Sequence, residues 1–281
     1  MKLAVLSGKG GTGKTFISVN LVNSAENANY YDCDVEEPNG DLFFKSKLLQ
    51  ELPVKVKMPN FDKEKCNACH ECVEACTFNA LALIGKDMLL FEDVCHSCGV
   101  CTLVCKQKAI TEVDKEVGII QVGEFGNSKI VTGKLNMGQS SGVPVISGVL
   151  DLIEEDKLNV IDCPPGSACS VVESTQKADY CLIVAEPTSF GFHNFKMVEQ
   201  LAKVLNKPFA VVVNKAESKN NMISAYCKKN DIKVLETFFF NRKIAQDNSR
   251  GEICTSFDNK MKDRFVSLLE SIKDDWQRSL K

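Results

Sequence analysis

Short apolar runs alternate with amphipathic stretches along most of this chain. Apolar runs that end at glycine or polar residues predict buried strands at 3–6, 158–161, 180–185, 208–213 and 232–238, with one more that ends at Tyr31. Helical spacing of apolar residues predicts helices at 14–26, 189–205, 219–230 and 259–280. Strands that alternate with helices predict the α/β class, with a mostly parallel sheet covered by helices on both faces.

The α/β pattern is interrupted in the first half of the chain. It fades from Pro53 to Lys57, and Pro59 marks a boundary. A cysteine-rich segment follows, and strands resume at 118–125 and 129–132. We therefore predict one α/β domain made of 1–58 and 119–281, with a small domain inserted at 59–118.

Composition narrows the kind of protein. The 281 residues carry a formal net charge of -3, are 44% hydrophobic and 25% charged, and contain no apolar run near the roughly 20 residues that a membrane span needs. We expect a cytoplasmic protein without a signal peptide, a nucleic-acid partner or a membrane anchor. Charges of both signs on the last helix favour docking against the sheet over binding to an anionic membrane. Fourteen cysteines in such a protein indicate metal binding and not disulfides.

The first predicted strand leads into a glycine-rich loop. Gly8-Lys9-Gly10-Gly11-Thr12-Gly13-Lys14-Thr15 satisfies the phosphate-loop pattern G-x-x-x-x-G-K-[ST]. Glycines let backbone N–H groups turn towards phosphates, and the next helix points its positive end at them. Lys14 is expected to reach the β and γ phosphates, and Thr15 to supply a hydroxyl to Mg²⁺.

Lys9, the additional lysine near the start of this loop, indicates a narrower class of P-loop protein. The form Lys-Gly-Gly-x-Gly-Lys-Thr resembles the deviant Walker A motif of the MinD/ParA superfamily of P-loop ATPases. The resemblance implies that Lys9 reaches the nucleotide of a partner subunit, and that ATP closes a homodimer or a heterodimer with a related ATPase. The alternative is that Lys9 is a solvated loop residue.

Further residues fit the superfamily in the expected order. Asp32 and Asp34 follow the second strand, where the superfamily has its first switch, and Asp162 follows 158–161 as the Walker B aspartate does. The resemblance implies that Asp32 and Asp162 hold the magnesium shell, that Asp34 positions the attacking water, and that Asn214 contacts adenine. Taken singly, each aspartate also reads as a solvated residue at the end of a strand.

Two cysteine runs carry the most specific pattern in the chain. Each run has the C-x2-C-x2-C-x3-C spacing of bacterial ferredoxins, although Thr77 and Lys106 stand where proline is usual. In two-cluster ferredoxins the fourth cysteine of each run serves the other cluster. That resemblance implies two [4Fe–4S] clusters, one on Cys66, Cys69, Cys72 and Cys105, the other on Cys95, Cys98, Cys101 and Cys76. Paired zinc sites are the rival interpretation, which this spacing fits poorly.

One further cysteine carries a weaker hypothesis. Cys169 lies seven residues after Asp162, at the distance where the nitrogenase iron protein, a member of the superfamily, has a ligand of a cluster that bridges two subunits. We hypothesise that Cys169 lies near a dimer axis and binds a metal there. The alternative is a small cysteine that packs against its neighbours.

Together these motifs resemble MinD/ParA ATPases with an inserted two-cluster ferredoxin domain. The cofactors implied are ATP or ADP, Mg²⁺ and two [4Fe–4S] clusters. Three functions follow: redox-coupled assembly or maturation of a metal cofactor with a partner protein, ATP-gated delivery of low-potential electrons to an enzyme, or positioning by an ATPase that carries an iron–sulfur sensor.

Overall fold

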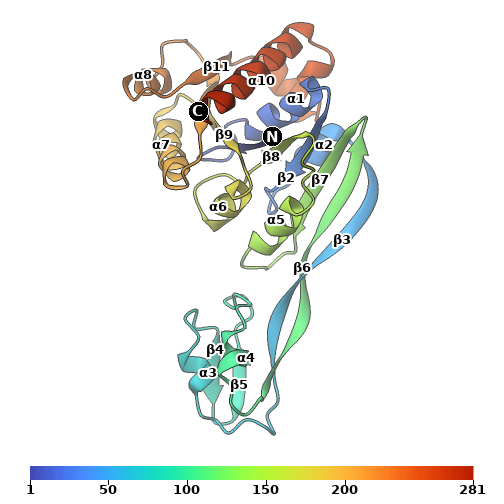
Figure 1. The fold of residues 1–281 in the computed structure, drawn as a ribbon, viewed down its shortest axis with the longest axis vertical. Helices are drawn as coiled ribbons and strands as arrows, with labels where there is room; N and C mark the ends of the chain where they lie inside the picture. The colour runs from blue at the N-terminus through green and yellow to red at the C-terminus, as the bar shows by residue number, and fades with distance from the viewer. Residues whose placement is uncertain (281) are drawn as a thin grey trace.

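In the computed structural model, which describes residues 1–280, nine strands join in one sheet (Figure 1). The strands of this sheet are β1 (Lys2–Leu6), β2 (Ala28–Asp32), β3 (Lys47–Phe61), β6 (Ile110–Phe125), β7 (Ser128–Leu135), β8 (Leu158–Asp162), β9 (Tyr180–Ala185), β10 (Phe209–Ala216) and β11 (Val234–Phe239). Their order is β11-β10-β9-β1-β8-β2-β7-β6-β3. Neighbours from β11 to β7 are parallel, whereas β6 and β3 are antiparallel. The predicted mostly parallel sheet is confirmed.

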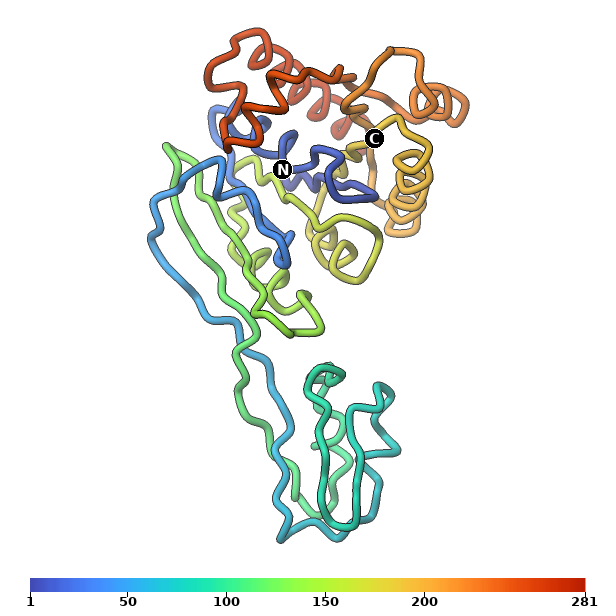
Figure 2. The backbone as a smooth tube through the Cα atoms, turned by 180° about the vertical axis from the view of Figure 1, so that it is seen from behind, coloured from blue at the N-terminus to red at the C-terminus, as the bar shows by residue number. Residues whose placement is uncertain are grey.

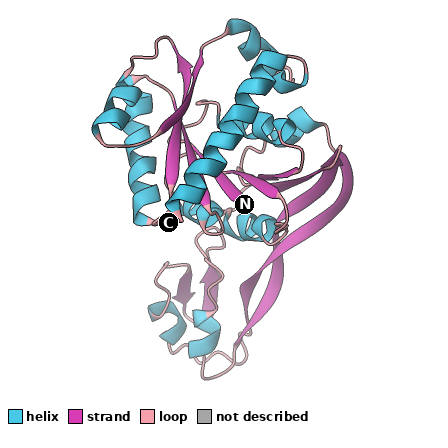
Figure 3. Ribbon diagram, turned by 45° about the horizontal axis from the view of Figure 1, so that its top comes forward, coloured by secondary structure: helices cyan, strands magenta, loops and turns pink. Residues whose placement is uncertain are grey.

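Helices cover both faces of the parallel part (Figure 3). The helices of this part are α1 (Lys14–Ser24), α2 (Gly40–Phe44), α5 (Val143–Leu150), α6 (Cys169–Thr175), α7 (Ser189–Val204), α8 (Met222–Lys229), α9 (Arg242–Ser249), the 3-10 helix η1 (Cys254–Ser256) and α10 (Asn259–Ser279). One apolar core lies under α5 to α8, and another lies under α1, α2 and α10. The sheet is therefore buried on both sides along its parallel strands, as parallel strands require.

The C-terminal helix α10 docks on the sheet as its pattern predicts. It buries an apolar stripe that includes Met261, Phe265 and Leu268, and Phe265 stacks on Phe238 of β11 with ring centroids 5.0 Å apart. No helix within residues 1–280 has a stretch long and apolar enough to cross a membrane.

The long strands β3 and β6 form an arm that projects from the sheet edge (Figure 2). They pair antiparallel from Lys47↔Glu124 to Phe61↔Ile110. The sequence pattern fades from Pro53 to Lys57, but β3 continues through these residues to Phe61. Proline is tolerated in β3 because an edge strand has one side without a partner, where no ladder N–H is needed.

The cysteine-rich segment lies at the far end of this arm. It contains the hairpin of β4 (Leu81–Ile84) and β5 (Asp87–Leu90) and the short helices α3 (Glu71–Glu74) and α4 (Val100–Val104). The expected boundaries, after residue 58 and before residue 119, fall inside β3 and β6. Two strands, and not a flexible linker, therefore join this segment to the sheet.

Helix α5 holds the base of the arm against the sheet. A Cβ atom on Gly118 of β6 would lie 2.7 Å from Val145, and one on Gly148 of α5 would lie 2.7 Å from Ile120. Glycine at both positions allows this close approach between helix and strand. The arm is thus packed tightly at the end near the parallel strands.

Candidate functional site

The glycine-rich loop turns between β1 and α1, at the carboxyl edge of the parallel strands. Gly11 and Gly13 adopt φ angles of 76° and 95°, which L side chains rarely adopt. A Cβ atom on Gly13 would lie 2.2 Å from the Asn214 amide nitrogen, and one on Gly8 would lie 2.3 Å from the Asn194 carbonyl oxygen. Glycine is therefore required at Gly11 for conformation, at Gly8 for space and at Gly13 for both.

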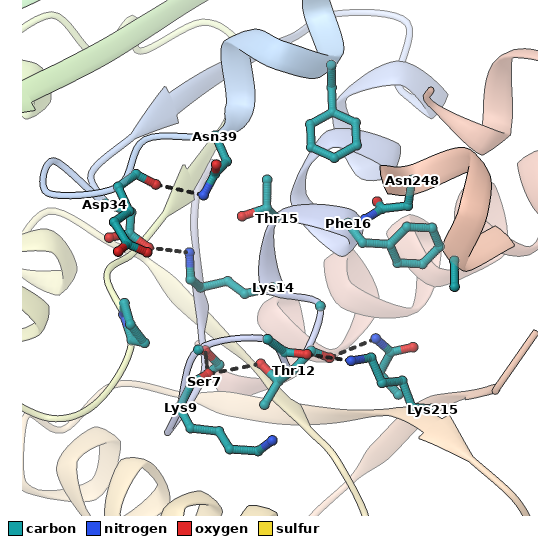
Figure 4. Close-up of a pocket in the computed structure, with 18 of the residues that line it drawn as sticks. Ser7, Lys9, Thr12, Lys14, Thr15, Phe16, Asp34, Asn39, Lys215 and Asn248 are labelled. Atoms are coloured by element: carbon teal, nitrogen blue, oxygen red, sulfur yellow. Dashed lines mark hydrogen bonds and ion pairs between the residues drawn. The ribbon is translucent and has the colours of Figure 1, made fainter. Parts of the chain in front are cut away.

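Lys14 lies among buried and half-buried carboxylates, and Figure 4 shows its ion pair with Asp34. Its ammonium is 2.8 Å from Asp162 Oδ1 and 3.6 Å from Asp34 Oδ2, and the side chain is 6% exposed. Burial alone would lower the pKa of Lys14, but the charges of Asp162 and Asp34 outweigh it and hold the pKa above its usual value. These carboxylates balance the positive charge of Lys14.

Asp32 lies beside this group on β2. Its Oδ2 accepts hydrogen bonds from the backbone N–H of Gly40 at 2.9 Å and of Asn39 at 3.1 Å. Burial and the charge of Asp162 raise the pKa of Asp32 to about 7, although Lys14 opposes the shift. A bound divalent cation would favour the ionised form of this carboxyl group.

Sequence reasoning missed two residues that hold Asp162. The Tyr30 hydroxyl donates to Asp162 Oδ2 at 2.8 Å, and the Ser18 hydroxyl donates to Oδ1 at 3.1 Å. Burial and the charge of Asp162 raise the pKa of Tyr30, so its phenol stays protonated and remains a donor. The sequence signal that could have placed Tyr30 near the carboxylates is alternation along β2, since residues 30 and 32 share one face of the strand.

Replacing Tyr30 with phenylalanine is expected to lower the free energy of unfolding by about 1.5–3 kcal/mol, the usual worth of a hydrogen bond to a charged group. Tyr31→Phe is the matched control, because the Tyr31 hydroxyl donates to the neutral carbonyl of Leu152 at 3.1 Å. Its loss should cost about 0.5–1.5 kcal/mol. Urea unfolding of both variants measures the difference, and equal losses would contradict the role given to Tyr30.

A large cavity of about 980 Å³ opens from the loop. Its lining includes Lys14, Thr15, Asp34 and Asn214, so the structure brings these predicted residues together. Asn214 donates to the carbonyl of Thr12 at 2.8 Å, and Lys215 donates to that of Gly11 at 2.6 Å. Beyond Asn214 the cavity continues along the apolar residues that end β11 and along α9, where a flat base could lie.

Lys9 points away from Lys14 (Figure 4) and lies near Phe190 of α7. Its ammonium is 2.8 Å from Glu186 Oε2 and 6.0 Å from the centre of the Phe190 ring. The solvated-loop alternative for Lys9 therefore does not describe this conformation, because the side chain has a specific partner. Glu186 directly follows β9 and is 177 positions away in sequence.

The eight clustered cysteines gather into two groups of four on the distal segment. Cys66, Cys69, Cys72 and Cys105 line one small cavity, and Cys76, Cys95, Cys98 and Cys101 line another. Burial raises the pKa of the Cys72 thiol, and the nearby Cys105 and Cys69 thiols raise it further. No three His, Cys, Asp or Glu side chains within residues 1–280 lie close enough together to hold a single metal ion.

The remaining cysteines lie apart from these two groups. Cys169 is exposed at the start of α6, and its neighbours Ala168 and Ser170 line the nucleotide cavity, whereas Cys169 does not. Cys33 and Cys163 are buried directly after β2 and β8, where burial raises the pKa of both thiols.

The fold and this loop define a P-loop nucleoside triphosphatase of the α/β class. Residues 3–253 match the CobQ/CobB/MinD/ParA nucleotide binding domain family, and the chain belongs to that family. Members of the MinD/ParA group are ATPases, and this chain is an ATP-hydrolysing enzyme.

Similar proteins include two from Methanocaldococcus jannaschii. Uncharacterized protein MJ0579 is 31% identical over 76% of this chain and 80% of its own length. Uncharacterized protein MJ0578 is 28% identical over 78% of this chain and 80% of its own length.

Among solved structures, the septum site-determining protein MinD complexed with Mg-ADP from Pyrococcus horikoshii has a TM-score of 0.60 and 15% identity, covering 96% of this chain and 95% of that one. A complex of Cyanothece McdA with ATP has a TM-score of 0.57 and 13% identity, covering 97% and 96%. At these identities the likeness shows the shared fold.

Proposed function

We propose that this chain is a cytoplasmic iron–sulfur ATPase that couples nucleotide-driven dimer closure to electron transfer during assembly or maturation of a metal cofactor. One observation carries the proposal. Two groups of four cysteines lie at the end of an arm whose strands continue into the ATPase sheet. A nucleotide site and a redox site on one continuous sheet favour a coupled function over two independent ones.

The residues of the cysteine-rich segment fit a pair of [4Fe–4S] clusters. Each cavity is lined by three cysteines of one run and the fourth cysteine of the other run, the pairing typical of two-cluster ferredoxins. Each thiolate of such a cluster binds a different iron, so its ligands need not converge on one ion. When bound, the clusters would store and pass single electrons. We therefore propose 59–118 as a ferredoxin domain inserted between 1–58 and 119–281.

Backbone N–H groups donate to the fourth cysteine of each run, which lies with the first three cysteines of the other run. The N–H of Ala80 donates to the sulfur of Cys76, and the N–H of Ala109 donates to that of Cys105, each at 3.3 Å. The donor lies four residues after the cysteine in both cases. Hydrogen bonds to ligand sulfurs tune cluster potentials, so this duplicated contact favours a redox role for both groups.

The nucleotide site supports Mg-dependent hydrolysis by the roles that the family implies. We assign Lys14 to the β and γ phosphates, Thr15 with Asp32 and Asp162 to magnesium, and Asp34 to the attacking water. Asn214 would contact adenine, with its amide nitrogen already bonded to the loop. MinD/ParA homologues dimerise with ATP, and we propose the same for this chain, with itself or with a related ATPase.

Val35 offers a physical link between the nucleotide site and the arm. It follows Asp34, and its carbonyl accepts from the Leu135 N–H at 2.9 Å. Its side chain lies 2.6 Å from the position of a Cβ atom on Gly142, directly before α5, and 2.7 Å from one on Gly133. A movement of Val35 on hydrolysis would therefore act directly on β7 and on the residue before α5, next to the base of the arm.

Two other functions remain open to the same test. An ATP-gated electron donor would use the same two sites to serve a partner enzyme. A positioning ATPase is the third candidate, and one protein of the same fold, MinD from Pyrococcus horikoshii, is a septum site-determining protein. In that case the cysteine-rich segment would act as a sensor, and binding to a partner would survive the loss of its iron.

The test is ATP hydrolysis by anaerobically purified protein, oxidised and then reduced with dithionite, with electron paramagnetic resonance of the same samples. We expect turnover to change on reduction, and the spectrum to change between ADP and a non-hydrolysable ATP analogue. A protein with two clusters in which neither signal responds to the other would overturn the coupling. Extra loosely bound metal beyond about eight irons per chain would favour cofactor assembly over electron donation.

A further inference from the structure

The ammonium group of Lys9 is engaged inside its own subunit. Its partner, Glu186, is 17% exposed and Lys9 is 23% exposed, so the ion pair is partly shielded from water. The Phe190 ring, 6.0 Å away, covers part of the remaining space around the ammonium. A lysine that reaches another subunit must first leave both contacts.

The backbone on both sides of this ion pair is fixed. The Lys9 carbonyl accepts from the hydroxyls of Ser7 at 3.0 Å and Thr12 at 3.4 Å. Glu186 follows β9, and Gly191 of α7 packs so closely that a Cβ atom would lie 2.2 Å from the Glu186 carbonyl oxygen. Because both backbones are held by these local contacts, a change of side-chain rotamer is the simplest way for Lys9 to leave Glu186.

We propose that Glu186 is a positioning residue for ATP hydrolysis, which holds Lys9 within its own subunit until an ATP-loaded partner offers a triphosphate in its place. This inference rests on the proposed ATP-dependent dimer and names the contact that regulates it. The triphosphate carries more negative charge than one carboxylate, so it can outcompete Glu186 for the ammonium, whereas a nucleotide without the γ phosphate competes less well.

The two-fold symmetry of a dimer doubles the effect of the contact. Each protomer must release its own lysine, so the competent fraction of monomers enters the dimerisation constant twice. A partly exposed ion pair is worth up to about 1 kcal/mol. A value in the middle of this range corresponds to about a threefold shift, for each protomer, in the fraction with Lys9 released. Removing Glu186 should therefore tighten dimerisation by about tenfold.

The experiment compares Glu186→Gln with the wild type by sedimentation across protein concentrations, with a non-hydrolysable ATP analogue and with ADP. The protein concentration that gives half-maximal ATPase activity is measured in parallel. Glu155→Gln is the matched control, because it removes an ion pair of the same 2.8 Å length, from Lys2, at an exposed carboxylate far from the loop. The change is also made in a Lys9→Ala background.

We expect Glu186→Gln to lower the dimer dissociation constant and the half-maximal concentration about tenfold, and to have no effect when Lys9 is absent. A simple structural role would persist in the Lys9→Ala background, and that outcome would overturn the proposal. Weaker dimerisation of Glu186→Gln would also overturn it, since Glu186 would then help Lys9 to cross. If the wild type never dimerises with the analogue, the proposed dimer fails; if it dimerises and the variant does not differ, only the role of Glu186 fails.

Discussion

Replacing Lys14 with alanine is expected to reduce ATP hydrolysis by about 100-fold or more, because the transferred phosphate loses the fixed positive charge of the lysine ammonium beside it. The same substitution should also destabilise the nucleotide-free protein by about 3–5 kcal/mol, the usual cost of breaking a buried ion pair. Asp162, Asp34 and Asp32 would remain as neighbouring buried or half-buried carboxylates without their cation. Urea unfolding at pH 7 without nucleotide measures this second effect.

Lys9→Ala is the control for that prediction, since both lysines belong to one loop. Lys9 pairs with a partly exposed carboxylate, so its removal should cost at most about 1 kcal/mol of stability. The pKa of Lys14 is raised, so its stabilising contribution is complete at neutral pH and is lost only when pH rises above the ordinary lysine range. Equal losses of stability in the two variants would show that Lys14 does not neutralise the buried carboxylates.

Cys66→Ala and Cys105→Ala are expected to lose the same cluster, although the two residues belong to different cysteine runs. Both line one cavity, whereas Cys76 lines the other with Cys95. Each variant should fall from about eight irons per chain to about four and keep the same remaining spectrum after reduction. Anaerobic iron analysis and electron paramagnetic resonance measure both quantities.

Cys76→Ala should lose the other cluster and keep the spectrum of the cluster that Cys66→Ala loses, although Cys76 closes the same run as Cys66. Cys227→Ala is the control, because this thiol is buried in α8 and belongs to neither group. If Cys66→Ala matches Cys76→Ala and differs from Cys105→Ala, each run serves its own cluster and the crossed arrangement is wrong.

The parallel part of the fold could be predicted because its strands are short apolar runs. β9 has the predicted bounds, and β8, β10 and β11 differ by at most three residues at either end. β3 could not be predicted, because its exposed edge needs no continuous apolar pattern and tolerates Pro53. α5 was also missed, since Val143–Leu150 is apolar almost throughout and contains both Pro144 and Gly148. Such a helix is recognised by burial on the sheet and not by periodicity.

The local part of the site could be predicted, and the long-range part could not. The phosphate loop is one continuous motif whose chemistry follows from spacing. The contact of Lys9 with Glu186 joins residues that meet only when β9 lies beside β1. In the sequence Tyr30 looks like an ordinary core residue of a strand. Only its place next to Asp162 in the fold shows that its hydroxyl has a polar role.

The arm also bears on how such a protein could arise. β3 and β6 leave and return side by side, with Phe61 opposite Ile110 at the point where the cysteine-rich segment begins. A tight turn could close the same hairpin without changing any residue of the two apolar cores. The segment is therefore placed where evolution can gain, lose or exchange it while the ancestral ATPase keeps folding, so relatives with a plain hairpin or a different insert are expected to share this sheet.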